Sequence, residues 1–160
     1  MQQEANDSAS SIAPLTSSEC VADLLLTGHS VRVRVQGRSM YPLIPDGSVL
    51  TLVPAPASAL RLGDVALYRS PDGRFICHRL LARRHIAGTT QLGFRGDAFA
   101  IPLDWVDSAN IMAMVAQQDG IRLDHPARRL AGWLYAWGRW LFSRTRIKLG
   151  AWRRQILYHR

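Results

Sequence analysis

The sequence contains a single lysine, two cysteines and no long uncharged apolar run. The lysine, Lys148, lies among arginines near the C-terminus, where it would stay charged and could not act as a general base. Cys20 and Cys77 form no metal-binding pattern and at most one disulfide, so we expect no metal ion and no other cofactor. No run of about 18 apolar residues predicts a membrane-spanning helix, and the N-terminus lacks the apolar centre of a secretory signal.

Positive charge is concentrated at the C-terminal end of the chain. Residues 121–160 contain ten Lys or Arg and one acid, a balance of +9, whereas residues 1–120 contain ten bases and eleven acids, a balance of −1. A nucleic-acid-binding domain usually carries a basic patch or a recognised motif on its folded part. The near-neutral first part has neither, which argues against nucleic acid as a partner.

The succession of patterns predicts one mainly β domain between two different ends. Residues 1–15 are polar and are expected to form a disordered tail. A short helix is predicted within residues 16–30, and runs between turn signals then predict a compact, mostly antiparallel sheet or barrel up to residue 123. The predicted strands are SVRVRVQG, SVLTLVP, GDVALYR, FICHRLLARR, TTQLGFRGD, NIMAMVAQQ and IRLD.

Residues 124–160 predict a basic amphipathic helix that starts at Pro126. Such a helix can pack on the β domain, or it can lie in the interface of an anionic membrane with its aromatic residues at the acyl boundary. The second hypothesis makes the protein a peripheral membrane protein on the cytoplasmic face. Its candidate lipid contacts are Trp133, Trp137, Trp140 and Arg139.

Ser39, in the stretch GRSMYP, follows a glycine-led turn and is a candidate nucleophile. A serine hydroxyl needs a neighbouring base to take its proton, and without a usable lysine the candidates are the five histidines. Only His78 lies in the middle of a predicted strand, on the same face as Ile76 and Leu80. That position fits a buried structural histidine as well as a general base.

The ordered set GRSMYP, LRLGDVALYR, FICHRLL and GFRGDAFAIPLD resembles the boxes of the type I signal peptidase superfamily, over about residues 31–116. The resemblance implies a β-rich catalytic fold and a serine endopeptidase that cleaves a signal or leader peptide from a preprotein after a small residue. In the common bacterial branch a lysine stands in place of His78. CHRLL is similar to the other branch, which uses histidine and includes the endoplasmic-reticulum signal peptidase catalytic subunit.

The resemblance also implies residue roles. Ser39 would be the nucleophile and its backbone N–H an oxyanion donor, while His78 would be the general base. Asp104 would orient the His78 imidazole and Asp97 would shape the site, although both aspartates fit the orienting role.

One departure from the family pattern lies beside Ser39. Many members carry a serine two residues before the nucleophile, where its hydroxyl helps to bind the oxyanion, and this chain has Gly37. Met40 and Pro42 are expected to have structural roles in the turn. The departure keeps a second interpretation open, a non-catalytic β-module of the same fold that binds a peptide or a membrane.

Overall fold

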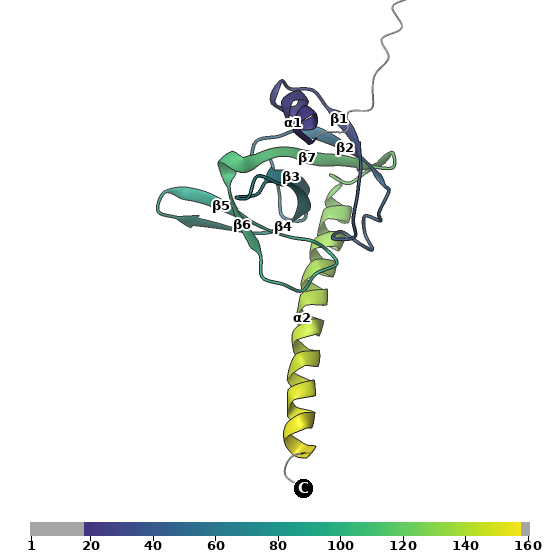
Figure 1. The fold of residues 1–160 in the computed structure, drawn as a ribbon, viewed down its shortest axis with the longest axis vertical. Helices are drawn as coiled ribbons and strands as arrows, with labels where there is room; N and C mark the ends of the chain where they lie inside the picture. The colour runs from purple at the N-terminus through teal and green to yellow at the C-terminus, as the bar shows by residue number, and fades with distance from the viewer. Residues whose placement is uncertain (1–17, 158–160) are drawn as a thin grey trace, which may run out of the picture.

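The computed structural model describes the backbone of residues 18–157 and the side chains of residues 19–143, so the expected disordered tail lies outside the described residues. A curled, half-closed antiparallel sheet forms the body of the molecule, with a short helix at one end and a long helix that projects from the other (Figure 1). The prediction of a mainly β, antiparallel fold with a short N-terminal and a long C-terminal helix is confirmed.

The strands of the sheet are short and nearly all follow the predicted runs. They are β1 (Val31–Arg34), β2 (Val49–Pro54), β3 (Val65–Arg69), β4 (Phe75–Ile86), β5 (Thr89–Arg95), β6 (Asp104–Asp107), β7 (Ile111–Gln118) and β8 (Ile121–Arg122). The helical elements are α1 (Ser18–Leu26), the 3-10 turn η1 (Ser108–Asn110) and α2 (Pro126–Leu157).

The order of the strands in the sheet is β1-β2-β7-β3-β4-β5-β6, and β8 pairs with β7. The late strand β7 therefore separates β2 from β3, which are neighbours in the sequence. Strand β6 was not predicted, because its four residues, DWVD, carry an acid at each end and only one fully buried side chain. It forms because it pairs with β5, where Asp104 lies opposite Phe94.

Two groups of buried side chains stabilise this sheet. The first lies between α1 and the β1-β2-β7 part and includes Leu25, Ile44, Leu50, Leu52 and Val115. The second lies on the β3-β4-β5-β6 part and contains Leu60, Ala66, Tyr68, Leu80, Leu92, Phe94 and Val106. We call them the first and second core clusters. Alternate residues of each strand enter them, as the period-2 patterns predict.

Helix α2 packs on the sheet through its first half. Gly132 lies directly against the Arg79 guanidinium, where a Cβ atom would overlap with it. The Trp133 indole N–H donates to the Leu81 carbonyl at 3.2 Å, and the Trp137 ring lies 5.6 Å from Arg95 Cζ. These two tryptophans, predicted as lipid contacts, therefore contact the β domain.

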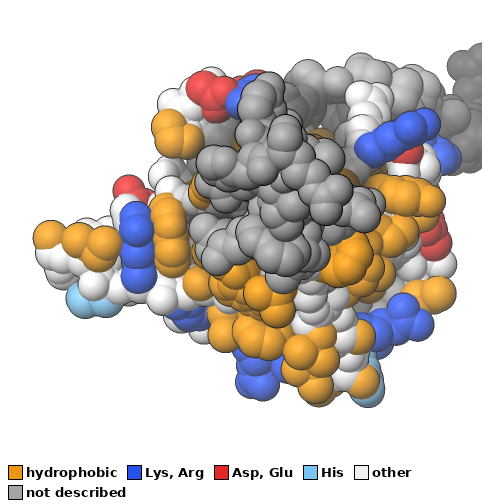
Figure 2. Space-filling model, turned by 90° about the horizontal axis from the view of Figure 1, so that it is seen from below, with side chains coloured by type: hydrophobic (Ala, Val, Ile, Leu, Met, Phe, Trp, Pro, Cys, Tyr) orange, Lys and Arg blue, Asp and Glu red, His pale blue; other side chains and the backbone are white. Residues whose placement is uncertain are grey.

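The apolar side chains that α2 exposes are mainly leucines. Leu130, Leu134 and Leu141 are 58%, 55% and 61% exposed. Figure 2 shows apolar side chains gathered on this face of the molecule. In the described part of the chain, no helix has both the length and the apolar character needed to cross a membrane.

Candidate active site

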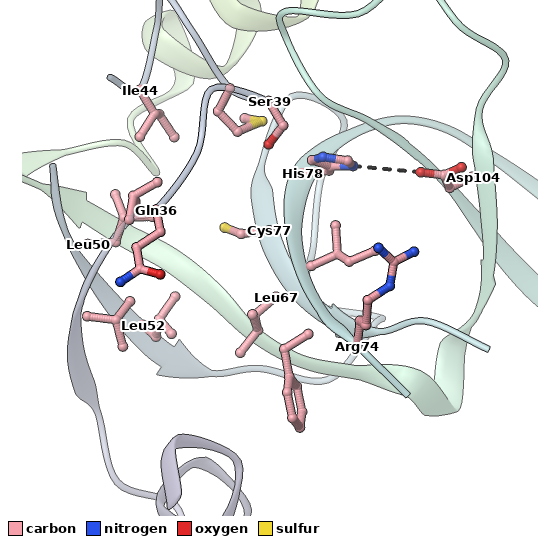
Figure 3. A pocket seen from close by; sticks show the side chains of 15 residues that line it. Gln36, Ser39, Ile44, Leu50, Leu52, Leu67, Arg74, Cys77, His78 and Asp104 are labelled. Carbon is pink, nitrogen blue, oxygen red and sulfur yellow. Dashed lines mark ion pairs between the residues drawn. The ribbon is translucent and has the colours of Figure 1, made fainter. Parts of the chain in front are cut away.

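A pocket of about 500 Å³ opens beside Ser39 and His78. Its apolar wall consists largely of residues of the first core cluster, among them Met40, Ile44 and Leu67. Figure 3 shows Ser39, His78 and Asp104 in a row along one side of this pocket. Residues from the β1–β2 loop, β4 and β6 thus meet at one place, although 65 positions separate Ser39 from Asp104.

The loop between β1 and β2 presents Ser39 through a backbone held at two points. Gly37 has a φ of +100°, in the region that favours glycine, and its N–H donates to Asp46 Oδ1 at 2.9 Å. The Ser39 carbonyl accepts a hydrogen bond from Ala98 N–H at 2.9 Å. Within the described residues the Ser39 N–H has no acceptor, so it is available to an incoming oxygen atom.

The neighbours of Ser39 have the structural positions expected of them. The Met40 side chain is 3% exposed and packs in the first core cluster. The peptide bond between Tyr41 and Pro42 is cis. Gly37 leaves open space where a side chain would stand, and its own N–H is occupied by Asp46. Gly37 therefore offers no donor to an oxyanion, whereas the Ser39 N–H can donate to one.

His78 lies in the middle of β4, opposite Ala66 of β3, and its side chain is 10% exposed. Its two ring nitrogens face different partners. Nδ1 lies 3.7 Å from Asp104 Oδ2 and 3.3 Å from the Tyr68 hydroxyl. Nε2 is on the side of Gly96, where a Cβ atom would lie 3.1 Å from it. This orientation leaves Nε2 for a proton from Ser39.

Gly96 brings the backbone of Ser39 and the ring of His78 close together. A Cβ atom at position 96 would overlap with the Ser39 carbonyl oxygen as well as approach His78 Nε2. No hydrogen bond joins Ser39 Oγ to His78 among the described residues. In enzymes without bound substrate this bond is often long and tightens when the substrate binds.

Tyr68 is the site residue that the sequence analysis missed. Its hydroxyl lies between His78 Nδ1 and Asp104 Oδ2, at 3.3 Å and 3.5 Å, so it can accept from the imidazole and donate to the carboxylate. A signal for it was available. The SPDG turn predicts a hairpin in which Arg69 pairs with Phe75, and in this register Ala66 of β3 pairs with His78 of β4. Tyr68 lies two residues after Ala66 on β3, so its side chain is on the same face of the sheet as His78.

Asp97 has a different partner from Asp104. It is 1% exposed and accepts two hydrogen bonds from Arg79, from Nε at 2.8 Å and from Nη2 at 2.7 Å. Arg79 also donates from Nη1 to the Gly63 carbonyl at 2.7 Å. The carboxylate beside the imidazole is that of Asp104, whereas Asp97 fixes the chain immediately after Gly96.

The burial of the site changes the acidity of its groups. Burial lowers the pKa of His78 below its ordinary value of 6.5, and the negative charges of Asp104 and Asp97 partly oppose this effect. The imidazole is therefore neutral at pH 7, as a general base must be. Burial, together with the Asp104 charge, raises the pKa of Tyr68, so its hydroxyl keeps its proton.

Cys77 lines the same pocket but is not prepared for nucleophilic attack. Burial raises the pKa of its thiol to about 12, so the reactive thiolate is scarce at neutral pH. Cys77 packs with the first core cluster, and its neighbour His78 points to the other face of β4. Ser39 is the hydroxyl nucleophile that the pocket offers.

Comparison with known proteins adds no assignment: the chain matches no family model and no curated protein. Within residues 18–157, no group of three or more histidine, cysteine or acidic side chains is placed to bind a metal ion. The chemistry open to the site is therefore that of the Ser39, His78, Tyr68 and Asp104 side chains.

Proposed function

We propose that the protein is a serine endopeptidase of the signal peptidase type, with Ser39 as nucleophile and His78 as general base. The observation that supports it most directly is the two-sided placement of the imidazole. Its Nδ1 faces Asp104 and the Tyr68 hydroxyl, while its Nε2 faces the Ser39 loop. A structural histidine also needs a hydrogen-bond partner for its buried N–H, but a general base needs in addition a second nitrogen that faces the nucleophile.

The same geometry suggests the steps of the reaction. His78 Nε2 takes the Ser39 Oγ proton as Oγ attacks the scissile carbonyl, and the Ser39 N–H binds the resulting oxyanion. Tyr68 and Asp104 stabilise the imidazolium through Nδ1. The imidazolium gives its proton to the leaving amine. A water molecule, deprotonated by His78, then attacks the acyl-enzyme, releases the carboxylate product and restores Ser39.

The substrate would be an extended peptide segment that lies along a strand beside the pocket, because main-chain hydrogen bonds align the scissile carbonyl. Resemblance to the signal peptidases favours a signal or leader peptide with a small residue before the cut. The mostly apolar wall of the pocket is suited to uncharged side chains.

A library of synthetic peptides, read by mass spectrometry in the presence of detergent or lipid, tests the proposal. The intact chain should cut a subset of the peptides, and Ser39→Ala should remove every one of these cuts, because no other activated nucleophile lies in the pocket. Cuts that persist in Ser39→Ala would contradict the assignment. An absence of cutting by both proteins would favour the non-catalytic peptide-binding module. The glycine at position 37 and the absence of a hydrogen bond between Ser39 and His78 in the described residues also favour that alternative.

We further propose that α2 associates with an anionic membrane surface, as a peripheral contact on the cytoplasmic face. The exposed side of the helix supports this, because Leu130, Leu134 and Leu141 recur at helical spacing in a segment with a charge balance of +9. The lipid contacts would be these leucines rather than Trp133 and Trp137.

Flotation with vesicles of phosphatidylglycerol and phosphatidylcholine tests this association. The double variant Leu134→Glu/Leu141→Glu should bind at least about 100-fold more weakly than wild type, since burial of each leucine contributes about 1.5–3 kcal/mol. Ile86→Glu is the control, because Ile86 is 52% exposed at the far end of β4. Equal binding of all three proteins, or equal binding to vesicles of phosphatidylcholine alone, would contradict the proposal.

A further inference from the structure

The segment between β5 and β6 connects helix α2 to the Ser39 loop through one residue. Ala98 N–H donates to the Ser39 carbonyl at 2.9 Å, and the Ala98 carbonyl accepts from Arg139 Nη2 of α2, also at 2.9 Å. The two bonds are thus formed by the N–H and the carbonyl group of the same residue. Arg139 therefore holds the peptide group that follows the one bonded to Ser39, so a displacement of α2 at Arg139 acts on Ser39 through the backbone of Ala98.

A second arginine holds the same segment to α2 from the opposite direction. Arg95, at the end of β5, is 2% exposed, and its Nη2 donates to the Ala136 carbonyl of α2 at 2.8 Å. Its Nη1 donates to the Ile101 carbonyl at 3.3 Å, within the segment itself. The segment is thus bonded to α2 directly at Ala98 and, through Arg95, at Ile101.

The close packing at Gly96 makes the Ser39 loop sensitive to this segment. Gly96 lies against the Ser39 carbonyl and near His78 Nε2, so a shift of the segment changes the relative positions of the two reacting groups. Because Gly37 supplies no hydroxyl, the oxyanion must be bound by backbone donors such as the Ser39 N–H. The direction of that N–H is set by the surrounding backbone. Displacements of about 1 Å at a reacting centre can lower a rate about 100-fold.

We propose that Arg139 is a positioning residue for the reaction, acting through Ala98 to hold the Ser39 backbone in its reactive orientation. The inference rests on the proposed endopeptidase function and extends it to a helix that contributes no reacting group. It predicts an effect on the turnover step and little effect on substrate affinity, since Arg139 is exposed on α2 and does not line the pocket.

The test compares three substitutions in the intact chain, with a peptide that wild type cuts in a Ser39-dependent way. Arg139→Met removes the donor and keeps much of the side-chain length, whereas Arg139→Lys keeps a donor. The control is Arg128→Met, an exposed arginine eleven residues earlier on α2, about 16 Å away along the axis. We expect Arg139→Met to lower kcat about tenfold or more with KM within about twofold, Arg139→Lys to restore most of kcat, and Arg128→Met to match wild type.

The outcomes separate this inference from the function on which it rests. Equal kcat values for Arg139→Met and Arg128→Met would overturn the positioning role and leave the endopeptidase proposal intact. A loss of kcat that Arg139→Lys does not restore, with a matching fall in Tm, would mark Arg139 as a purely structural contact and overturn it as well. Wild type without any Ser39-dependent cutting would overturn the endopeptidase proposal and, with it, the inference.

Discussion

His78→Gln is expected to lower the rate of peptide cleavage by about 10²–10⁴, the usual contribution of a general base. Glutamine keeps polarity at a buried position but cannot accept and return the Ser39 proton. The control is His85→Gln, because His85 lies on the same strand, is exposed, and forms a side-chain hydrogen bond with the Thr90 hydroxyl at 3.2 Å, far from Ser39 in the sequence. The kcat of His85→Gln should match that of wild type. Comparable losses of kcat in His78→Gln and His85→Gln would contradict a catalytic role for His78.

The pH profile gives an independent measure of the same role. The pKa of His78 lies below 6.5, so kcat/KM should be constant near neutral pH and fall once the pH drops through that pKa and the imidazole gains its proton. The negative charge of Asp104 raises this pKa, so Asp104→Asn should lower it further. The acid limb of the profile should move to lower pH in that variant. A limb that stays in place would remove Asp104 as the partner of His78.

Gly132→Ala is expected to lower the free energy of unfolding by about 1–3 kcal/mol, the usual cost of overpacking. A Cβ atom at position 132 would lie 2.5 Å from Arg79 Cζ and would press on the guanidinium that holds Asp97. Either α2 must withdraw from the sheet or the buried ion pair must shift, and both changes are unfavourable. Chemical denaturation, with midpoints compared at constant m, measures the loss.

Gly138→Ala is the matched substitution in the same helix. No atom lies within 4 Å of a Cβ at that position, so the variant should gain about 0.5–1 kcal/mol from the lower backbone entropy of alanine in the unfolded chain. The two substitutions should therefore change stability in opposite directions. A change of the same sign and size in both would mean that α2 does not pack on Arg79 as described.

The sequence predicted every strand except β6 because each of those strands carries its own pattern, and it predicted the long helix for the same reason. It did not predict β6, because four residues with acidic ends carry too little pattern and depend on their pairing with β5. The position of Asp104 beside His78 depends on that pairing. The side-chain directions of α2 were also missed. Helical spacing groups Trp133 with Trp137, but only the tertiary contact with Leu81 and Arg95 shows that they face the sheet.

The candidate site was predictable in part, for reasons that differ between residues. His78 could be selected because few alternative bases exist in the sequence, one lysine and one histidine inside a predicted strand, and Ser39 because it lies in the stretch GRSMYP. The spatial arrangement of Ser39 and His78 could not be predicted from the sequence. It depends on the insertion of β7 between β2 and β3, a long-range pairing that has no local sequence signal. Tyr68 lay within reach of the hairpin register, which places it diagonally from His78.

The place of β7 has a consequence for the newly synthesised chain. Strand β7 pairs with β2 on one side and β3 on the other, so it joins the strand that follows the Ser39 loop to the hairpin that carries His78. A ribosome adds Ser39, His78 and Asp104 before it adds residues 111–118. A nascent chain that stops at Asn110 holds every reacting group of the proposed enzyme but lacks the strand that joins their supports. Any activity of the proposed enzyme would therefore require the chain to extend through β7.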